Sequence, residues 1–259
     1  MKTSLAAFLS LTAMLFLTMA VDAGAAKKQA NPPTLRFSGY LWDVRQAGTG
    51  GPGPNLWDPA NAWVDAQGRL HLKLSHGKDG WQCVEVSTRQ KFGMGRYQFQ
   101  ISSPLDHLDP NIVLGLFDYP TPDVGPDGTN EIDIEFSRWG DPKHPMDNDT
   151  VFPAQAGLPS ATQAFPMPPG IVDTTHRFVR QPGQIGFQSL RGLRNDDVGE
   201  FAHWTFRPAD PEKRVPQKAL PIHLNLWLMQ GKPPQDGQEV EIIIRQFSFQ
   251  PEKHSRGHR

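Results

Sequence analysis

The chain has 259 residues, enough for one large β domain or two small ones, and its formal net charge of −1 argues against a sequence-independent grip on nucleic acid. Its 24 glycines and 25 prolines follow no repeat period, which favours many turns and few helices. The single cysteine, Cys83, excludes an internal disulfide, so a hydrophobic core must hold the fold together.

The first 26 residues are typical of a secretory signal peptide. Lys2 supplies a positive charge, the run from Leu5 to Met19 is apolar, and small alanines follow as far as Ala26. The apolar run is short for a membrane span and two lysines follow it, so an uncleaved anchor is the weaker interpretation. We therefore expect a secreted protein, extracellular or periplasmic, with no membrane contact after the signal is removed.

Segments of alternating polarity fill most of the remaining chain. Residues 27–35 predict a short disordered lead-in, and residues 251–259 predict a basic disordered tail. The alternation predicts strands over residues 37–44, 69–75, 81–89, 96–101, 111–118, 131–136, 176–180, 184–189, 201–206, 221–228 and 238–250.

Two further details follow from this pattern. Val240 and Phe247 have opposite parity in the last strand, which predicts a β-bulge near Arg245. Residues 140–172 are rich in proline and poor in periodicity, and they predict long loops around at most one short strand. Many short strands at intervals of about ten residues predict an all-β antiparallel sandwich, with residues 36–250 as one domain.

The segment from Glu131 to Phe136 has the most unusual pattern. Period-two alternation places Glu131, Asp133 and Glu135 on one face of a strand and apolar residues on the other. Like charges about 7 Å apart repel, so at least one of the three carboxyl groups must have a raised pKa, as a general acid requires. The plainer alternative is a solvated strand with an acidic face.

Other strands repeat this asymmetry, with aliphatic residues on one face and polar or aromatic residues on the other. Aromatic rings beside carboxylates are typical of carbohydrate sites, because rings stack on sugars and acids bind their hydroxyls. Parity places Trp139 and Trp227 on the acid-bearing face. For Trp42, Trp63 and Trp204, we expect packing in the core.

The segment Glu131-Ile132-Asp133-Ile134-Glu135-Phe136 resembles the Glu-x-Asp-x-Glu signature of glycoside hydrolase family 16, which contains lichenases and laminarinases. Segments at 81–85, 92–97, 111–117, 181–185 and 225–227 are similar to family segments in the expected order. The resemblance implies a concanavalin-like β-jelly-roll sandwich with a concave substrate cleft. It also implies a monomeric, endo-acting hydrolase that cleaves a β-linked polysaccharide by a retaining double displacement.

By position in the motif, the resemblance makes Glu131 the nucleophile, Glu135 the general acid/base and Asp133 the assisting carboxylate. It implies substrate contacts for the following residues: Asn55, Glu85, Phe117, Asn225 and Trp227. Parity adds Trp139 to this set. The family's arginine two residues after the matching Glu is Ser87 here, and Arg89 is expected to substitute. Asn130 and Arg180 also depart from the family, which leaves the choice of sugar open.

The histidines show no metal-binding spacing, so we expect no catalytic metal and no required cofactor. The resemblance allows a structural Ca²⁺ on the convex side, for which the sequence assigns no ligands. Three other functions stay open: a transglycosylase at the same site, a non-catalytic carbohydrate-binding module, and a structural envelope protein.

Overall fold

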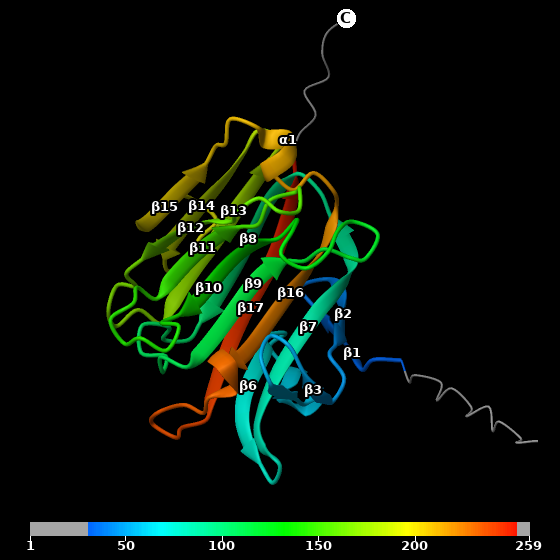
Figure 1. Cartoon of the computed structure of the whole chain (residues 1–259). Helices are drawn as coiled ribbons and strands as arrows, with labels where there is room; N and C mark the ends of the chain where they lie inside the picture. The colour runs from blue at the N-terminus through cyan, green and yellow to red at the C-terminus, as the bar shows by residue number, and fades with distance from the viewer. Residues whose placement is uncertain (1–30, 253–259) are drawn as a thin grey trace, which may run out of the picture. The chain divides into compact units, whose positions relative to one another are not determined.

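The computed structural model of the chain describes residues 31–252, which form an almost wholly β unit (Figure 1). The predicted signal peptide, residues 27–30 of the predicted lead-in and residues 253–259 of the predicted tail lie outside the described residues. Within residues 31–252, no helix is both long and apolar enough to span a membrane.

The first sheet carries the acidic strand near its centre. In spatial order, its strands are β1 (Thr34–Phe37), β2 (Tyr40–Val44), β7 (Gly80–Phe92), β16 (Leu220–Leu228), β9 (Ile112–Asp118), β10 (Ile132–Ser137), β11 (Asp147–Val151) and β12 (Ala161–Phe165). All of these neighbours pair antiparallel. Figure 1 shows β7, β16, β9 and β10 side by side in front of β17.

The second sheet packs behind the first. In spatial order, its strands are β5 (Ala62–Val64), β6 (Leu70–Gly77), β17 (Val240–Pro251), β8 (Gly95–Ser102), β13 (Asp173–Gln181), β14 (Gln184–Arg191) and β15 (Glu200–Phe206). The β6–β7 hairpin links the sheets, and β3 (Gly48–Gly50) and β4 (Asn55–Trp57) lie beside it. The helical segments are short: η1 (Pro59–Asn61), α1 (Pro211–Arg214) and η2 (Met229–Gly231).

The core lies between the two sheets and is built from the side chains on the aliphatic face of each strand. Val86, Leu116 and Leu224 of the first sheet are fully buried, as are Leu72 and Phe99 of the second. Burial of large apolar side chains stabilises by about 1.5–3 kcal/mol each, which is how a chain without a disulfide holds two sheets together. The antiparallel jelly-roll sandwich predicted from the sequence is confirmed.

Several local predictions can be compared with this structure. The strands predicted over residues 176–180 and 184–189 are confirmed and pair as the β13–β14 hairpin, and the register of β17 shifts between Ile244 and Gln246, as the predicted bulge requires. The single strand predicted over residues 37–44 is wrong in detail, because Ser38 and Gly39 adopt positive φ and turn the chain between β1 and β2. The prediction for residues 140–172 is also wrong, because this region contributes both β11 and β12.

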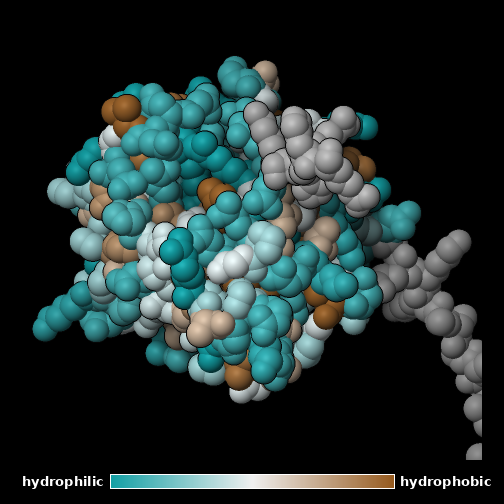
Figure 2. Space-filling model, turned by 90° about the horizontal axis from the view of Figure 1, so that it is seen from above, coloured by the Kyte–Doolittle hydropathy of each residue, from teal (hydrophilic) through white to brown (hydrophobic). Residues whose placement is uncertain are grey.

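The tryptophans divide into buried and exposed. Trp42 is fully buried, and Trp204 is half-buried with its ring stacked 5.3 Å from that of Phe187. Trp63 is 37% exposed, so the prediction that it packs in the core is wrong. Figure 2 shows a largely hydrophilic face with only small, scattered hydrophobic patches.

Candidate active site

The register of the first sheet aligns the acids with polar residues on neighbouring strands. Asp133 of β10 lies opposite Phe117 of β9, which lies opposite His223 of β16. In the next row, Glu135 lies opposite Gly115, and Gly115 lies opposite Asn225, which pairs with Glu85 of β7. Because paired residues point to the same face, one face of four strands gathers these side chains.

Gly115 keeps the centre of this face open. A Cβ atom built on Gly115 would lie 2.5 Å from Oδ1 of Asn225 and 3.3 Å from the ring of Phe117. Any larger residue would therefore displace two side chains that face the acids. The glycine is required here by close approach, since its backbone φ is not positive.

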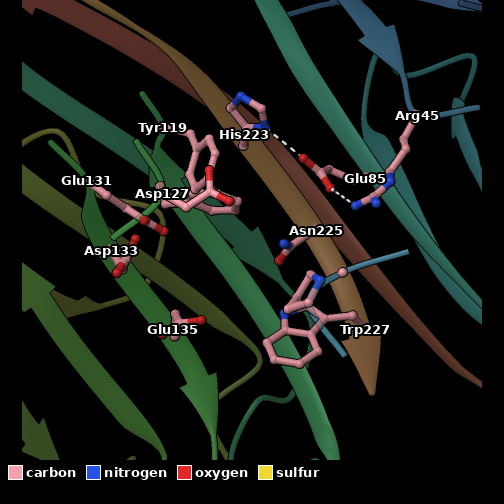
Figure 3. Close-up of a pocket in the computed structure, with 13 residues that line it drawn as sticks. Arg45, Glu85, Tyr119, Asp127, Glu131, Asp133, Glu135, His223, Asn225 and Trp227 are labelled. Carbon is pink, nitrogen blue, oxygen red and sulfur yellow. Dashed lines mark hydrogen bonds and ion pairs between the residues drawn. The ribbon is translucent and has the colours of Figure 1, made fainter. Parts of the chain in front are cut away.

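The result is a pocket of about 590 Å³ over the first sheet (Figure 3). The pocket is lined by Arg45, Gly51, Pro52, Glu85, Phe117, Tyr119, Asp127, Glu131, Asp133, Glu135, His223, Asn225 and Trp227. In Figure 3, the three acids project from β10 on one side, and Asn225 and Trp227 project from β16 on the other. The pocket thus has an acidic wall facing an aromatic and polar wall.

The acidic wall holds its protons unusually tightly. Burial raises the pKa of Glu131 to about 8 and that of Glu135 to about 7. Asp133 is 2% exposed, and burial together with the charges of both glutamates raises its pKa well above the usual range. A hydrogen bond between Asp133 and Glu131 favours a protonated Asp133 and an ionised Glu131. The three carboxyl groups therefore titrate as a set that retains protons at neutral pH.

The opposite wall keeps one carboxylate ionised. Arg45 Nη1 donates to Glu85 Oε2 at 2.8 Å, and Glu85 Oε1 lies 2.7 Å from His223 Nδ1. Burial alone would raise the pKa of Glu85, but the hydrogen bonds and charges of His223 and Arg45 outweigh it and lower that pKa. Glu85 is therefore a fixed hydrogen-bond acceptor, held by residues from β16 and from the end of β2 (Figure 3).

The end of the pocket beside Glu131 carries a tyrosine–carboxylate pair. Tyr119 shares a hydrogen bond with Asp127, and burial together with this bond raises the pKa of the Tyr119 hydroxyl. The charge of Asp127 also contributes to the raised pKa of Glu131. Asp127 belongs to the proline-rich loop that precedes β10, so this loop shapes the electrostatics of the first acid.

Four of the substrate-contact residues expected from the sequence line the pocket together with the three acids. These are Glu85, Phe117, Asn225 and Trp227. Asn225 Oδ1 is buried and accepts no hydrogen bond from the described residues, which leaves it available to a ligand hydroxyl. The register that places these residues beside β10 gives them one common surface.

Three other expected residues do not line the pocket. Asn55 is 2% exposed, and its Nδ2 donates to the backbone carbonyls of Pro52 and Leu228. Arg89 pairs with Asp43 at 2.7 Å on the exposed surface.

Trp139 is the third. It adopts a φ of 52° and is half-buried, with its ring centroid 6.4 Å from that of Trp227. It supports a pocket residue, and the positive φ shows why simple strand parity misplaced it beyond the end of β10.

Besides Gly51 and Pro52, sequence reasoning missed four residues that line the pocket with polar side chains: Arg45, Tyr119, Asp127 and His223. Arg45 places an arginine beside Glu85, where Arg89 was expected, and it lies 40 residues before Glu85 in the chain. Only the parity of His223 with Asn225 and Trp227 gave a signal that could have identified one of the four.

No three His, Cys, Asp or Glu side chains of residues 31–252 are grouped so as to hold a metal ion. The structure therefore assigns no such ligand set to the structural Ca²⁺ that the resemblance allows.

The raised pKa values of the carboxyl groups predict that the acidic wall lowers the stability of the fold as the pH rises. The ordinary pKa of a glutamate is 4.5 and that of Glu131 is about 8, so the folded chain binds more protons than the unfolded chain between these values. Stability therefore falls as the pH rises through this window. Glu131→Gln is expected to melt above the wild type, by a margin that grows by several degrees between pH 5 and pH 8.

Thermal melts monitored by circular dichroism at both pH values test this prediction. Glu212→Gln, an exposed substitution in α1, serves as the control and should leave the margin near zero at each pH. A margin for Glu131→Gln that stays constant with pH would contradict the assignment of the raised pKa.

Neither the known protein families nor the curated proteins contain a match to this chain. Solved structures do match. A prokaryotic β-1,3-1,4-glucanase (lichenase) from a mouse hindgut metagenome is 22% identical, with a TM-score of 0.60, over 83% of this chain and 95% of that one. A family 16 glycoside hydrolase endo-glucanase from Bacteroides ovatus is 14% identical, with a TM-score of 0.59, over 81% and 94%.

A third similar structure comes from Mycobacterium tuberculosis and is described as an immunostimulatory antigen and pseudo β-1,3-glucanase. It is 18% identical, with a TM-score of 0.59, over 79% of this chain and 88% of that one. At such identities the likeness establishes the fold. The chain has the sandwich fold of the family 16 glycoside hydrolase structures, over most of their length.

Proposed function

We propose that the chain is a secreted, endo-acting glycoside hydrolase of family 16 that cleaves a β-linked glycan with retention of configuration. The observation that carries this proposal is the set of three carboxyl groups on one face of β10, with raised pKa values, at the wall of a 590 Å³ pocket. Retaining hydrolysis needs two carboxyl groups, one protonated and one ionised. The similar glucanase folds and the signature at residues 131–136 support the same conclusion.

In the proposed first step, Glu135 donates its proton to the glycosidic oxygen while the Glu131 carboxylate attacks the anomeric carbon. The bond from that carbon to the leaving oxygen breaks, and a glycosyl ester with Glu131 forms. In the second step, Glu135 takes a proton from water, the water oxygen attacks the same carbon, and Glu131 leaves as a carboxylate. Two displacements at one carbon restore the β configuration.

The protons that Glu131, Asp133 and Glu135 retain have a role in this catalytic cycle. The raised pKa of about 7 leaves Glu135 partly protonated at neutral pH, and the first step uses the form of the set in which Glu135 holds the proton and Glu131 has lost its own. The hydrogen bond from Asp133 favours the ionised form of Glu131, and it can follow the change in charge as the ester forms and breaks. Asp133 thus assists without contacting the anomeric carbon.

The opposite wall would hold the sugars. Trp227 and Phe117 present rings for the apolar face of a pyranose, and Glu85 presents an ionised acceptor for a hydroxyl. Asn225 offers a buried acceptor between them. This wall faces the acids across the pocket, so a bound chain would lie with one linkage over Glu131 and Glu135 (Figure 3).

Removal of the Trp227 ring is expected to weaken substrate binding more than turnover. A stacking ring contributes about 0.5–1.5 kcal/mol, so Trp227→Ala should raise KM about tenfold with a smaller change in kcat. Steady-state kinetics and a thermal melt measure both effects. Trp204→Ala removes a ring outside the pocket and should leave KM unchanged. An unchanged KM in folded Trp227→Ala would count against this wall as the binding surface.

A reducing-sugar screen over laminarin, lichenan, xyloglucan, agarose and carrageenan tests the proposed function, with Glu131→Gln as the inactive control. New reducing ends from the wild type alone support the hydrolase. Products longer than the substrate, formed when an acceptor sugar is added, would identify a transglycosylase. Binding without any product would identify a carbohydrate-binding module.

A further inference from the structure

Trp63 is exposed on a sheet that does not form the pocket. It lies on β5, an edge strand of the second sheet, whereas the pocket is lined mainly from strands of the first. At 37% exposure, Trp63 is the most exposed Phe, Tyr or Trp side chain of residues 31–252, and the other exposed large hydrophobic residues there are Val172 and Val198. An exposed tryptophan that is held in place needs a physical explanation.

The ring of Trp63 has a rigid backing. It stacks on the imidazole of His71, its partner across β5 and β6, with a centroid distance of 4.9 Å and an angle of 14°. Both imidazole nitrogens are held, with Nδ1 2.7 Å from Glu241 and Nε2 3.0 Å from Asp65. Asp65 is itself fixed by Arg69 at 2.5 Å. The backing fixes the orientation of Trp63, so a ligand would lose little entropy in ordering it.

The surroundings of the ring are polar and carry both signs of charge. Arg69 and Lys73 are about one-third exposed, and Lys73 pairs with Glu239 at 2.7 Å. Glu241 is 42% exposed, so donors and acceptors lie on the same sheet face as the ring. A single ring is too small for the apolar core of a protein interface, which needs several hundred Å² on each side. One aromatic face within a charge-balanced polar rim fits the apolar face and hydroxyl edge of a sugar.

We propose that Trp63 is the platform of a second glycan-binding site, which takes the same β-linked polysaccharide as the pocket. The identity of the glycan rests on the proposed function. A long polysaccharide bound at Trp63 would raise the effective concentration of its other segments at the pocket. The site would therefore act on polymers and have no effect on short oligosaccharides.

The experiment compares the wild type, Trp63→Ala and Trp63→Phe in native gels that contain each of the five polysaccharides of the screen. For the polysaccharide that the wild type cleaves, Trp63→Ala should bind about five- to tenfold more weakly, whereas Trp63→Phe keeps a ring and should bind nearly as the wild type does. With a short oligosaccharide substrate, kcat/KM should be equal for all three. Thermal melts verify that each variant is folded.

The outcomes separate this site from the proposed function. Cleavage by the wild type together with equal migration of Trp63→Ala and wild type in every gel would overturn the second site alone. Trp63-dependent retardation without cleavage would overturn the hydrolase and leave the binding site standing. If the wild type is neither retarded nor active with any of the five, both proposals fail.

Discussion

Glu131→Gln is expected to reduce kcat on the best polysaccharide of the screen by about 10³-fold or more, with the fold intact. The amide keeps the size of the side chain but cannot form the glycosyl ester. Because burial already favours the neutral form of Glu131, the amide also fits the folded state without an electrostatic penalty. A folded and inactive protein is therefore the expected combination, and a thermal melt alongside the assay checks both parts.

The variant Glu135→Ala distinguishes the general acid/base, Glu135, from the nucleophile, Glu131. An aryl glycoside has a leaving group that needs little protonation, so Glu135→Ala should still form the glycosyl ester with it and then stall. Added azide should release this ester as a β-glycosyl azide, after two displacements. In Glu131→Ala, azide takes the place of the missing nucleophile in one displacement and should give the α-glycosyl azide. Nuclear magnetic resonance of the products identifies each anomer.

The exposed Glu212→Gln should keep the wild-type rate and controls for a general effect of losing a carboxylate. Wild-type rates in Glu131→Gln or Glu135→Gln would refute the assigned mechanism. Azide products with the opposite anomers would exchange the roles of the two glutamates.

The part of the site that lies on single strands could be predicted from the sequence. The alternation that places Glu131 and Glu135 on one face is local, because side chains in a strand alternate whatever the neighbours are. The same holds for Asn225 and Trp227 on β16. In the structure, β9 lies between β10 and β16, and its register aligns Glu135 with Gly115 and Gly115 with Asn225. Gly115 has no side chain and so leaves room for Asn225 on the shared face.

The polar pairs across the pocket could not be predicted in this way. Arg45 and His223 reach Glu85 from positions 40 and 138 residues away, and no periodic pattern links segments so far apart. Arg89 lies on the same strand as Glu85, and strand parity places it on the same face of the sheet, so the sequence favoured it as the arginine of the site. Its nearer partner is Asp43 on the neighbouring β2, which keeps it on the surface.

Buried strands made of polar residues could not be predicted from the sequence either. β11 has no aliphatic alternation, and its Asp147 is fully buried. Asp147 accepts a hydrogen bond from Ser189 of the second sheet at 2.9 Å, and Ser189 in turn lies 2.8 Å from His176 Nδ1. Such a strand is stabilised by specific partners across the core, which composition alone does not reveal.

Arg180 departs from the family pattern, and the structure shows that it is the cation of a buried ion pair. Its Nη1 lies 2.9 Å from Oδ2 of Asp118, and both side chains are fully buried. Its Nη2 donates to the backbone carbonyl of Phe92 and to the hydroxyl of Tyr97. The other oxygen of Asp118 accepts from the backbone N–H of Ile132, next to Glu131. The pair therefore ties β13 to the start of the acidic strand.

Arg180→Met is expected to cost about 3–5 kcal/mol of unfolding free energy, because it leaves Asp118 buried without its cation. Burial raises the pKa of Asp118 to about 6 and the charge of Arg180 opposes this rise, so the pKa should climb further in the variant. A raised folded-state pKa means that stability is lost as the pH rises, so the deficit should be larger at pH 8 than at pH 5. Urea unfolding at the two pH values measures it.

The double variant Asp118→Asn with Arg180→Met separates the charge from the packing. The introduced amide can still accept from the Ile132 N–H and carries no charge, so the double variant should be more stable than Arg180→Met alone, most clearly at pH 8. Equal stability of the two variants at pH 8 would show that lost packing accounts for the cost. A gain would show that the cost comes from the unpaired buried charge of Asp118. Because Asp118 also holds the backbone beside Glu131, the loss of activity in Arg180→Met should then follow the same pH dependence as its loss of stability.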